Sequence, residues 1–199
     1  MLPFISCWVS MPNKKQRIIA FCGLMGIIGL SVAFYSLPLL FTFLGQHQEV
    51  FKQLRAWTMG ARFVTDKKVM LQSSNNDCGL ASLKTILTAY GVDPKLLDRS
   101  SHLRLTPKGT SMLDLRNVSV KLGLRAKSWF IHPEDLSLVP LPAIAFVNKN
   151  HFVVLRKFVT PEVLEVDDPA LGRIRWRSRS FKKAWSGEML VFDPDWTPL

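Results

Sequence analysis

Cysteine is scarce in this sequence of 199 residues, which contains three: Cys7, Cys22 and Cys78. An odd number of thiols, two of them at or inside the apolar N-terminus, gives no paired framework, so a disulfide-stabilised scaffold is not indicated. Internal repeats and low-complexity tracts are also absent, which argues against a repeat architecture. The length fits one globular domain with an additional segment.

Acidic residues are few, with 15 Asp and Glu against 26 Lys and Arg, and the formal net charge is +11. Residues 1–50 contain three basic residues and one acidic residue, a net of +2, so residues 51–199 carry the remaining +9. An excess of this size favours an acidic partner or a membrane surface. Nucleic acid is not an expected partner, because no platform of stacking aromatic residues and no recognised binding motif is present.

Part of this excess lies in one short alternating stretch. On a strand, alternation would place four guanidinium groups on one face and the intervening apolar residues on the other. Such a face is either a solvated sheet surface or a site that captures an acidic peptide or anionic lipid head groups. The four arginines are Arg173, Arg175, Arg177 and Arg179.

Charged residues are missing altogether between Ile18 and Gly45. This run exceeds the roughly 20 apolar residues that cross a bilayer, and Pro38 places the core of the predicted transmembrane helix at Ile18–Pro38. A buried helix of a soluble core is one alternative. A cleaved signal peptide is another, with Ser31-Val32-Ala33 as a cleavage site, although the chain stays apolar beyond it.

The orientation in the membrane is usually predicted from the basic residues on the two sides of the apolar run. Three precede it and three follow within about 20 residues, so the count is a tie. A short basic tail before a first span usually remains in the cytoplasm, and a signal peptide would export the same portion. We therefore expect a single-pass protein of the inner membrane with residues 46–199 outside the cytoplasm, and the cytoplasmic alternative stays open. The residues are Lys14, Lys15 and Arg17 before the run, and Lys52, Arg55 and Arg62 after it.

The composition divides the chain into four parts. Residues 1–17 form a basic tail and residues 18–45 the anchor. Residues 46–68 are polar and basic without strong periodicity, and are interpreted as a juxtamembrane helix or linker. A compact domain is expected over residues 69–195, a usual domain size.

The stretch Leu71–Gly91 places Cys78 at the start of an amphipathic helix. Asn76 and Asp77 are suitable cap residues, Gly91 is a natural stop, and an apolar stripe recurs at helical spacing. A thiol in the first turn meets free N–H groups and the helix dipole, which favour the thiolate. Cys78 is therefore a candidate nucleophile, and a small buried cysteine is the alternative. The stripe consists of Leu80, Leu83, Ile86, Leu87 and Tyr90.

The second half of the domain changes from helices to strands. Short helices are expected over Lys95–Ser100 and from Thr110-Ser111 to about Leu122. The following runs are rich in Val, Ile, Phe and Leu, and Asn148-Lys149-Asn150 joins two of them as a hairpin turn. Helices followed by hairpin-linked strands predict an α+β domain with an antiparallel sheet. The expected strands are Leu124–Phe130, Ala143–Val147, His151–Phe158 and Val163–Val166.

Two polar residues of this half have the types that a cysteine nucleophile requires. His151 begins a strand directly after a turn, and Asp168 lies at the turn after the next strand. Neighbouring ends of antiparallel strands meet, so Asp168 could accept a hydrogen bond from the ring nitrogen of His151 that faces away from Cys78. His102 and His132 are alternatives in unpatterned sequence.

These residues resemble peptidase family C39, the papain-like processing domains of bacteriocin-exporting ABC transporters. The resemblance covers about Val69–Phe192. Its landmarks follow in order: Gln72-x5-Cys78-Gly79-x-Ala81, Leu141-Pro142-Ala143-Ile144, His151-Phe152-Val153-Val154, Asp168-Pro169-Ala170-x-Gly172 and Phe181-x3-Trp185-Ser186-Gly187.

The resemblance implies Cys78 as nucleophile, His151 as general base, Asp168 as the residue orienting it, and Gln72 as a donor to the oxyanion. No cofactor or metal is expected. Ser82 stands where many members of the family have a second cysteine. No Walker A sequence and no six-helix transporter domain occur, which predicts a stand-alone, membrane-anchored peptidase.

The family's substrates imply what this chain would cleave: precursor peptides whose helical leader ends in a double glycine. A secreted or periplasmic protein with a small-residue site is equally compatible with the sequence. The alternative function is a membrane-tethered, non-catalytic module that holds a peptide for a separate exporter. Expected partners are therefore the substrate, membrane lipid and possible export machinery.

Overall fold

The structure is a computed structural model that describes residues 25, 48–65, 67–99 and 109–193. The predicted anchor, residues 18–45, lies outside these ranges except for Met25, as does the basic tail, residues 1–17. No helix within the described ranges is both long and apolar enough to cross a membrane. Residues 51–199 form one compact unit, which is described below by itself.

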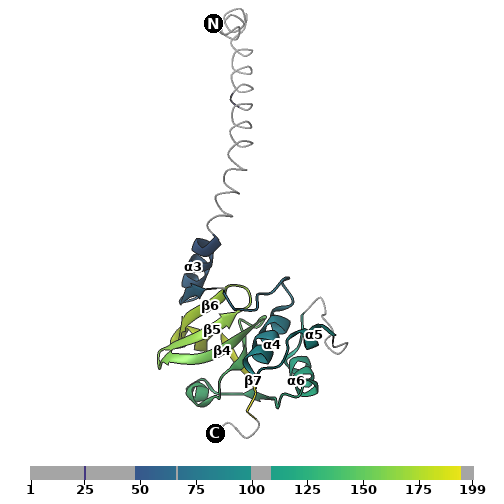
Figure 1. Ribbon diagram of the computed structural model, residues 1–199. Coiled ribbons are helices and arrows are strands. Elements are labelled where there is room, and N and C mark those ends of the chain that lie inside the picture. Colours follow the sequence, from purple (N-terminus) through teal and green to yellow (C-terminus); the bar gives the residue numbers. More distant parts are fainter. Residues whose placement is uncertain (1–24, 26–47, 66, 100–108, 194–199) are drawn as a thin grey trace, which may run out of the picture. The chain divides into compact units, whose positions relative to one another are not determined.

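The prediction of an α+β domain with an antiparallel sheet is confirmed (Figure 1). Seven strands pair in the order β1-β6-β5-β4-β3-β7-β2, and every pair is antiparallel. The strands are β1 (Ala61–Thr65), β2 (Lys127–Phe130), β3 (Ala143–Val147), β4 (His151–Thr160), β5 (Val163–Asp168), β6 (Gly172–Arg177) and β7 (Trp185–Val191). The helices are α3 (Gln48–Thr58), α4 (Cys78–Ala89), α5 (Lys95–Arg99), α6 (Met112–Lys121), α7 (Ser178–Ala184) and the 3-10 helix η1 (Pro133–Leu138).

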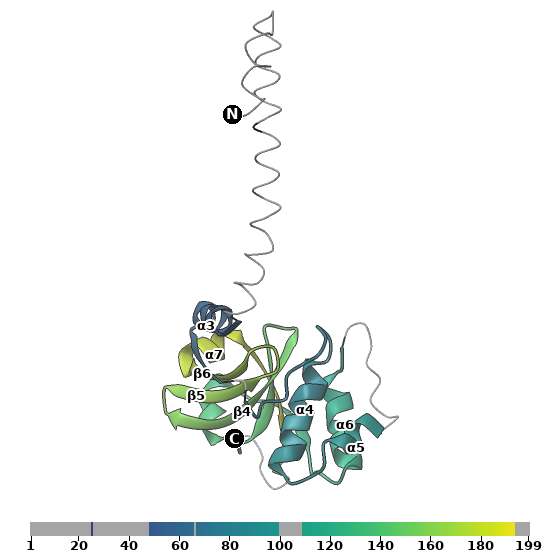
Figure 2. The same cartoon turned by 45° about the horizontal axis from the view of Figure 1, so that its top comes forward.

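Alternation along the central strands produces two apolar layers, one on each side of the sheet. Ile144 and Val154 face α4 and α6, whereas Ala145 and Leu155 join a second cluster with Trp176 of β6. Figure 2 shows α4, α5 and α6 together on one side of the unit, and α7 near β6 on the other. The helix that begins at Cys78 is thereby fixed against β3 and β4.

Local signals determine the two features that later position the site. Asn148 and Lys149 have φ of 53° and 60°, which suits a tight hairpin between β3 and β4, and Val147 pairs with His151. Helix α4 ends at Ala89 with Tyr90 as its C-cap, and Gly91 follows with φ of 73°, in agreement with the stop that was predicted at this glycine. Tyr90, assigned to the apolar stripe, is 44% exposed, and its ring lies tilted against Phe192 with the ring centroids 5.9 Å apart.

Several predicted boundaries were wrong. The stretch 46–68, expected to be a juxtamembrane helix or linker, contains the helix α3, but it also contains the unpredicted edge strand Ala61–Thr65, which pairs with β6. The strand expected from Leu124 begins at Lys127, and β7, a strand inside the sheet, was not predicted. Arg179 lies on α7 rather than on a strand, since β6 ends at Arg177.

Candidate active site

A polar loop leads into α4 and fixes the start of this helix. Asp77 occupies the N-cap position, but with φ −105° and ψ 13° its side chain does not cap the helix. Its carboxylate instead accepts hydrogen bonds from Ser73 N (2.9 Å), the Ser73 hydroxyl (2.6 Å) and Ser74 N (3.1 Å). Burial opposes ionisation of Asp77, yet these bonds lower its pKa. The first-turn N–H groups of α4 are therefore not consumed by the cap residue.

Cys78 is the first residue of α4 and is 7% exposed. A Cβ on the next residue, Gly79, would lie 3.2 Å from the ring of Phe152 and 3.4 Å from Thr110. Glycine at this position therefore allows strand β4 to approach the helix start closely. This approach brings the first residue of β4, His151, to the thiol.

His151 bridges the thiol and a buried carboxylate. Its Nε2 lies 2.8 Å from Asp168 Oδ1, and the two side chains are 17% and 2% exposed. The N–H of Ala170 also donates to Asp168 Oδ1, at 2.8 Å, which holds the carboxylate in place. Nδ1 of the ring is thus left for Cys78, with which His151 is hydrogen-bonded.

The pKa values of both groups favour an ion pair. Burial alone would raise the pKa of the Cys78 thiol, but hydrogen bonds from the His151 ring and from the backbone of Phe152 lower it. Burial would also lower the pKa of His151, but the bonds to Asp168 and Cys78 raise it to about 9. A thiolate beside an imidazolium is the form that attacks carbonyl carbon.

We expect Cys78 to react with iodoacetamide at neutral pH faster than an ordinary thiol. The alkylation rate should fall at acid pH, where the thiolate is protonated. It should change again near pH 9, where His151 loses its proton. His151→Ala should move the acid limb towards the ordinary thiol pKa of about 8.5, because it removes the hydrogen bond and the charge. Mass spectrometry of alkylated Cys78 against pH measures this. An unchanged limb in His151→Ala would contradict the assignment of the pair.

Gln72 is held in place by two hydrogen bonds, one from its backbone and one from its side chain. Its N–H donates to Pro169 O at 2.9 Å, next to Asp168. Its Nε2 donates to Ser74 O at 2.9 Å, and within the described chain its buried Oε1 has no hydrogen-bond partner. An amide NH₂ has two hydrogens, so one remains for an oxyanion.

The other candidates named from the sequence do not join this group. His102 lies outside the described ranges, and His132 is an exposed residue before η1 that contacts Phe130. Asp167, adjacent to Asp168, binds Arg156 (2.9 Å) and Arg173 (2.7 and 3.1 Å) instead. Successive strand residues point to opposite faces, which separates the two carboxylates.

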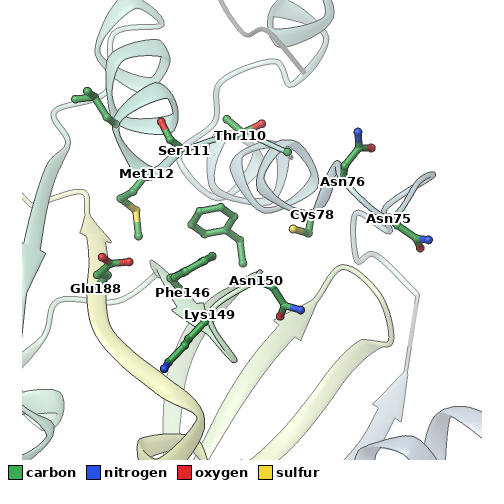
Figure 3. Close-up of a pocket in the computed structure, with 13 residues that line it drawn as sticks. Asn75, Asn76, Cys78, Thr110, Ser111, Met112, Phe146, Lys149, Asn150 and Glu188 are labelled. Atoms are coloured by element: carbon green, nitrogen blue, oxygen red, sulfur yellow. The ribbon is translucent and has the colours of Figure 1, made fainter. Parts of the chain in front are cut away.

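A cavity of about 630 Å³ adjoins Cys78. Figure 3 shows Met112 and Phe146 between Cys78 and Glu188, with Lys149 and Asn150 of the hairpin along one border. A further hollow of about 470 Å³ shares three of its residues (Met112, Leu113 and Glu188) and adds Phe130. Together they form an open groove that leads away from the thiol.

Thr110, at which the sequence predicted only the start of a helix, lines the groove. Thr110 is 9% exposed, and its buried Oγ1 has no hydrogen-bond partner in the described part of the chain. The capping role belongs to Ser111, whose hydroxyl accepts from Asp114 N in a capping box. The capping box is the sequence signal that could have shown this. Because Ser111 caps the helix, the Thr110 hydroxyl is not needed for that purpose.

Among the described residues, no three His, Cys, Asp or Glu side chains are grouped so as to hold a metal ion. The groups present suit nucleophilic chemistry: the Cys78 thiol, the His151 imidazole and the Asp168 carboxylate follow one another through hydrogen bonds. This is the arrangement of nucleophile, base and orienting group.

Comparison with protein families gives a match over the same residues. The family model described as "Peptidase C39 family" matches residues 66–197. The chain is similar to the probable functional amyloid protease FapD of Pseudomonas aeruginosa, with 34% identity over 127 residues. It is also similar to the lacticin-481/lactococcin-DR transport/processing ATP-binding protein lcnDR3 of Lactococcus lactis, with 30% identity over 136 residues.

The matched part is a fraction of each of these relatives. It covers 58% of this chain and 56% of FapD, and 64% of this chain and 19% of lcnDR3. The chain therefore spans about half the length of the first protein and about a fifth of the second.

Solved structures agree with the fold. A double glycine motif protease from an AMS/PCAT transporter, in complex with the leader peptide, is 29% identical with a TM-score of 0.58, over 63% of this chain and 90% of that one. The peptidase domain of Streptococcus ComA is 23% identical with a TM-score of 0.54, over 63% and 97%, and shows the fold alone. The papain-like, α+β prediction for the domain is thereby confirmed.

Proposed function

The chain belongs to the peptidase C39 family of cysteine peptidases, and we propose that it removes a leader from a precursor by cutting after a double-glycine-type site. The observation that carries the proposal is the hydrogen-bonded series Cys78–His151–Asp168 at one end of an open groove. Cys78 attacks the carbonyl carbon, and His151 passes a proton to the leaving amine. Asp168 orients the ring and stabilises its charge.

The developing oxyanion needs hydrogen-bond donors. The N–H of Cys78 at the start of α4 is one, since the Asp77 side chain does not occupy the helix end. The second hydrogen of Gln72 Nε2 is the other in our proposal, and its bond to Ser74 O keeps the amide in one orientation. Each such donor typically contributes about 100- to 1000-fold in rate.

Two features of the groove support a leader as the substrate. Cys78 is only 7% exposed beside Phe152 and Thr110, which leaves little room for side chains next to the cleaved bond. Further along, Leu113 and Phe130 are 60% and 66% exposed, and an apolar helix face binds such surfaces. The similarity to the probable functional amyloid protease FapD favours an amyloid-forming protein as a second class of substrate.

Replacing the residue before the cleaved bond tests this proposal. We expect a precursor with glycine at both positions before the bond to be cut, and one with leucine directly before it to be cut at least about 100-fold more slowly. Mass spectrometry of the products and kcat/KM measure the effect. A control precursor carries leucine after the bond, where this restriction is not expected. Equal cleavage of all three would contradict the proposed site and leave the peptidase assignment intact.

We also propose that residues 18–45 anchor the protein in the inner membrane, with the peptidase domain outside the cytoplasm. The charge-free run and the short basic tail before it support this. A reporter fused after Leu199 that signals a cytoplasmic location would overturn the orientation. The alternative function, a tethered module that binds peptide without cutting it, requires an unreactive Cys78, which the lowered thiol pKa disfavours.

A further inference from the structure

A second hollow lies at the β1 edge of the sheet and shares no residue with the groove at Cys78. Its volume is about 600 Å³, and Arg62, Arg175 and Arg177 line it. Trp57 and Gln53 of α3 form another part of its wall. The hollow therefore combines three guanidinium groups with one aromatic side chain.

Strand register explains why the three arginines gather here. Arg62 of β1 lies directly opposite Arg175 of β6, and Arg177 follows two residues later, so all three point to one face. Their neighbours Ile174 and Trp176 point the other way and are buried. This is the face that α4 covers over the middle of the sheet, and the arginines are exposed at its far edge.

These arginines differ from the others of the same sheet in lacking partners. Arg173 and Arg156 both bind the carboxylate of Asp167. Within the described ranges, no ion pair or side-chain hydrogen bond engages Arg62, Arg175 or Arg177. Like charges placed directly opposite on paired strands are unfavourable, and an anion bound at this position would relieve the repulsion.

Carboxylates on this face do not neutralise it. Glu165 lies opposite Arg175 but is 9% exposed and has Arg156 and Lys157 at 3.9 and 4.0 Å. The positive charge continues onto α7, where Arg179 and Lys182 line an adjoining hollow of about 470 Å³ with Arg177, and among the described residues Glu162 is the one acidic residue that lines this hollow.

Helix α3 presents an apolar stripe at the same edge. Phe51, Leu54 and Trp57 are spaced by three residues, so they share one side of the helix. They are 47%, 55% and 71% exposed, whereas Ala56 on the opposite side is fully buried in the core. Large apolar side chains grouped outside the core mark a contact surface. Trp57 belongs both to this stripe and to the arginine hollow.

We propose that α3 and the arginine hollow form a docking surface for an anionic lipid bilayer. Arginines would hold head-group phosphates, for which the guanidinium group is well suited. Phe51, Leu54 and Trp57 would enter the boundary between head groups and acyl chains, where aromatic and aliphatic faces of amphipathic helices lie. An acidic peptide would use the hollow but leave the stripe exposed. The charge-free sequence Ile18–Gly45 directly precedes α3, which also favours a membrane.

Quenching of Trp57 in the full chain tests this surface without depending on whether another segment holds the protein in the membrane. The chain is reconstituted into vesicles with brominated acyl chains, of phosphatidylcholine alone or mixed with phosphatidylglycerol. Six tryptophans contribute, so the Trp57 signal is the difference between the full chain and Trp57→Phe. We expect strong quenching of this signal in anionic vesicles, weak quenching in neutral ones, and loss of the difference at high salt.

The triple variant Arg62→Gln, Arg175→Gln, Arg177→Gln should lose the quenching, because each basic residue near an anionic surface contributes about fivefold to binding. A matched variant removes three exposed charges from the helical half, Lys95→Gln, Lys121→Gln and Arg125→Gln, and should retain it. Unchanged alkylation of Cys78 shows that both are folded.

Equal quenching in neutral and anionic vesicles, or equal loss in both triple variants, would overturn the proposal. So would an arginine variant that keeps the quenching but binds an acidic peptide more weakly, since the surface would then serve the peptide. None of these results bears on the peptidase assignment.

Discussion

Replacing Cys78 by alanine is expected to abolish cleavage, by about 10⁴-fold or more in kcat/KM. The change removes the only atom that attacks the carbonyl carbon and leaves the groove intact. Stability should change by no more than about 1 kcal/mol, since one buried sulfur atom is lost. Turnover is measured with a precursor peptide and the folded state by thermal unfolding.

Ser82→Ala is the matched control for this variant. Ser82 lies one turn further along α4, is fully buried, and has a hydroxyl without a partner in the described part of the chain. It should cleave at nearly the wild-type rate. His151→Ala should be close to Cys78→Ala, and combining both should add little, because the two groups act as one unit. Near-normal turnover by Cys78→Ala would end the catalytic assignment.

Substitutions of Asp168 and Asp167 are expected to have different effects, the first on the rate of cleavage and the second on stability. Asp168→Ala removes the acceptor 2.8 Å from His151 Nε2, so the ring is misplaced and kcat should fall by roughly 100-fold. The pKa of His151 should also fall from about 9, since Asp168 is the main group that raises it. The high-pH limit of activity then moves to lower pH. Asp168→Asn keeps an acceptor and should recover part of the rate.

Asp167→Asn should instead lower stability and spare the chemistry. The Asp167 side chain is 1% exposed and pairs with two guanidinium groups, Arg156 and Arg173. Losing its charge should cost about 2–3 kcal/mol, less than a fully buried pair because both arginines keep contact with water. This corresponds to roughly 5–10 °C in Tm. A rate loss in Asp167→Asn that exceeds that in Asp168→Ala would place the orienting carboxylate one residue earlier.

Parts of the site follow from short-range sequence signals. The helix at Cys78 begins and ends where its polar start and Gly91 predict. The hairpin that presents His151 forms where Asn148-Lys149-Asn150 predicts a turn, because asparagine tolerates the positive φ that Asn148 adopts. Both features depend on neighbours within a few residues, so the sequence by itself was sufficient.

Other parts depend on residues far apart in the chain. β1 joins the sheet only by pairing with β6, which lies more than 100 residues later in the chain. Its five residues are too few for their hydrophobic pattern to predict a strand. The bond of Gln72 to Ser74, the unpartnered hydroxyl of Thr110 and the position of Arg179 on a helix were likewise decided by the tertiary structure.

The carboxylate that binds His151 shows most clearly the difference between what the sequence determines locally and what the tertiary structure decides. The sequence, through its resemblance to a family, pointed to Asp168, which stands next to a second aspartate, Asp167. Pairing of β5 with β4 and β6 turns one carboxylate towards the histidine and the other towards two arginines. Strand register is set by hydrogen bonds and burial across the whole sheet, so the residues next to Asp167 and Asp168 do not by themselves decide which of the two carboxylates meets the histidine.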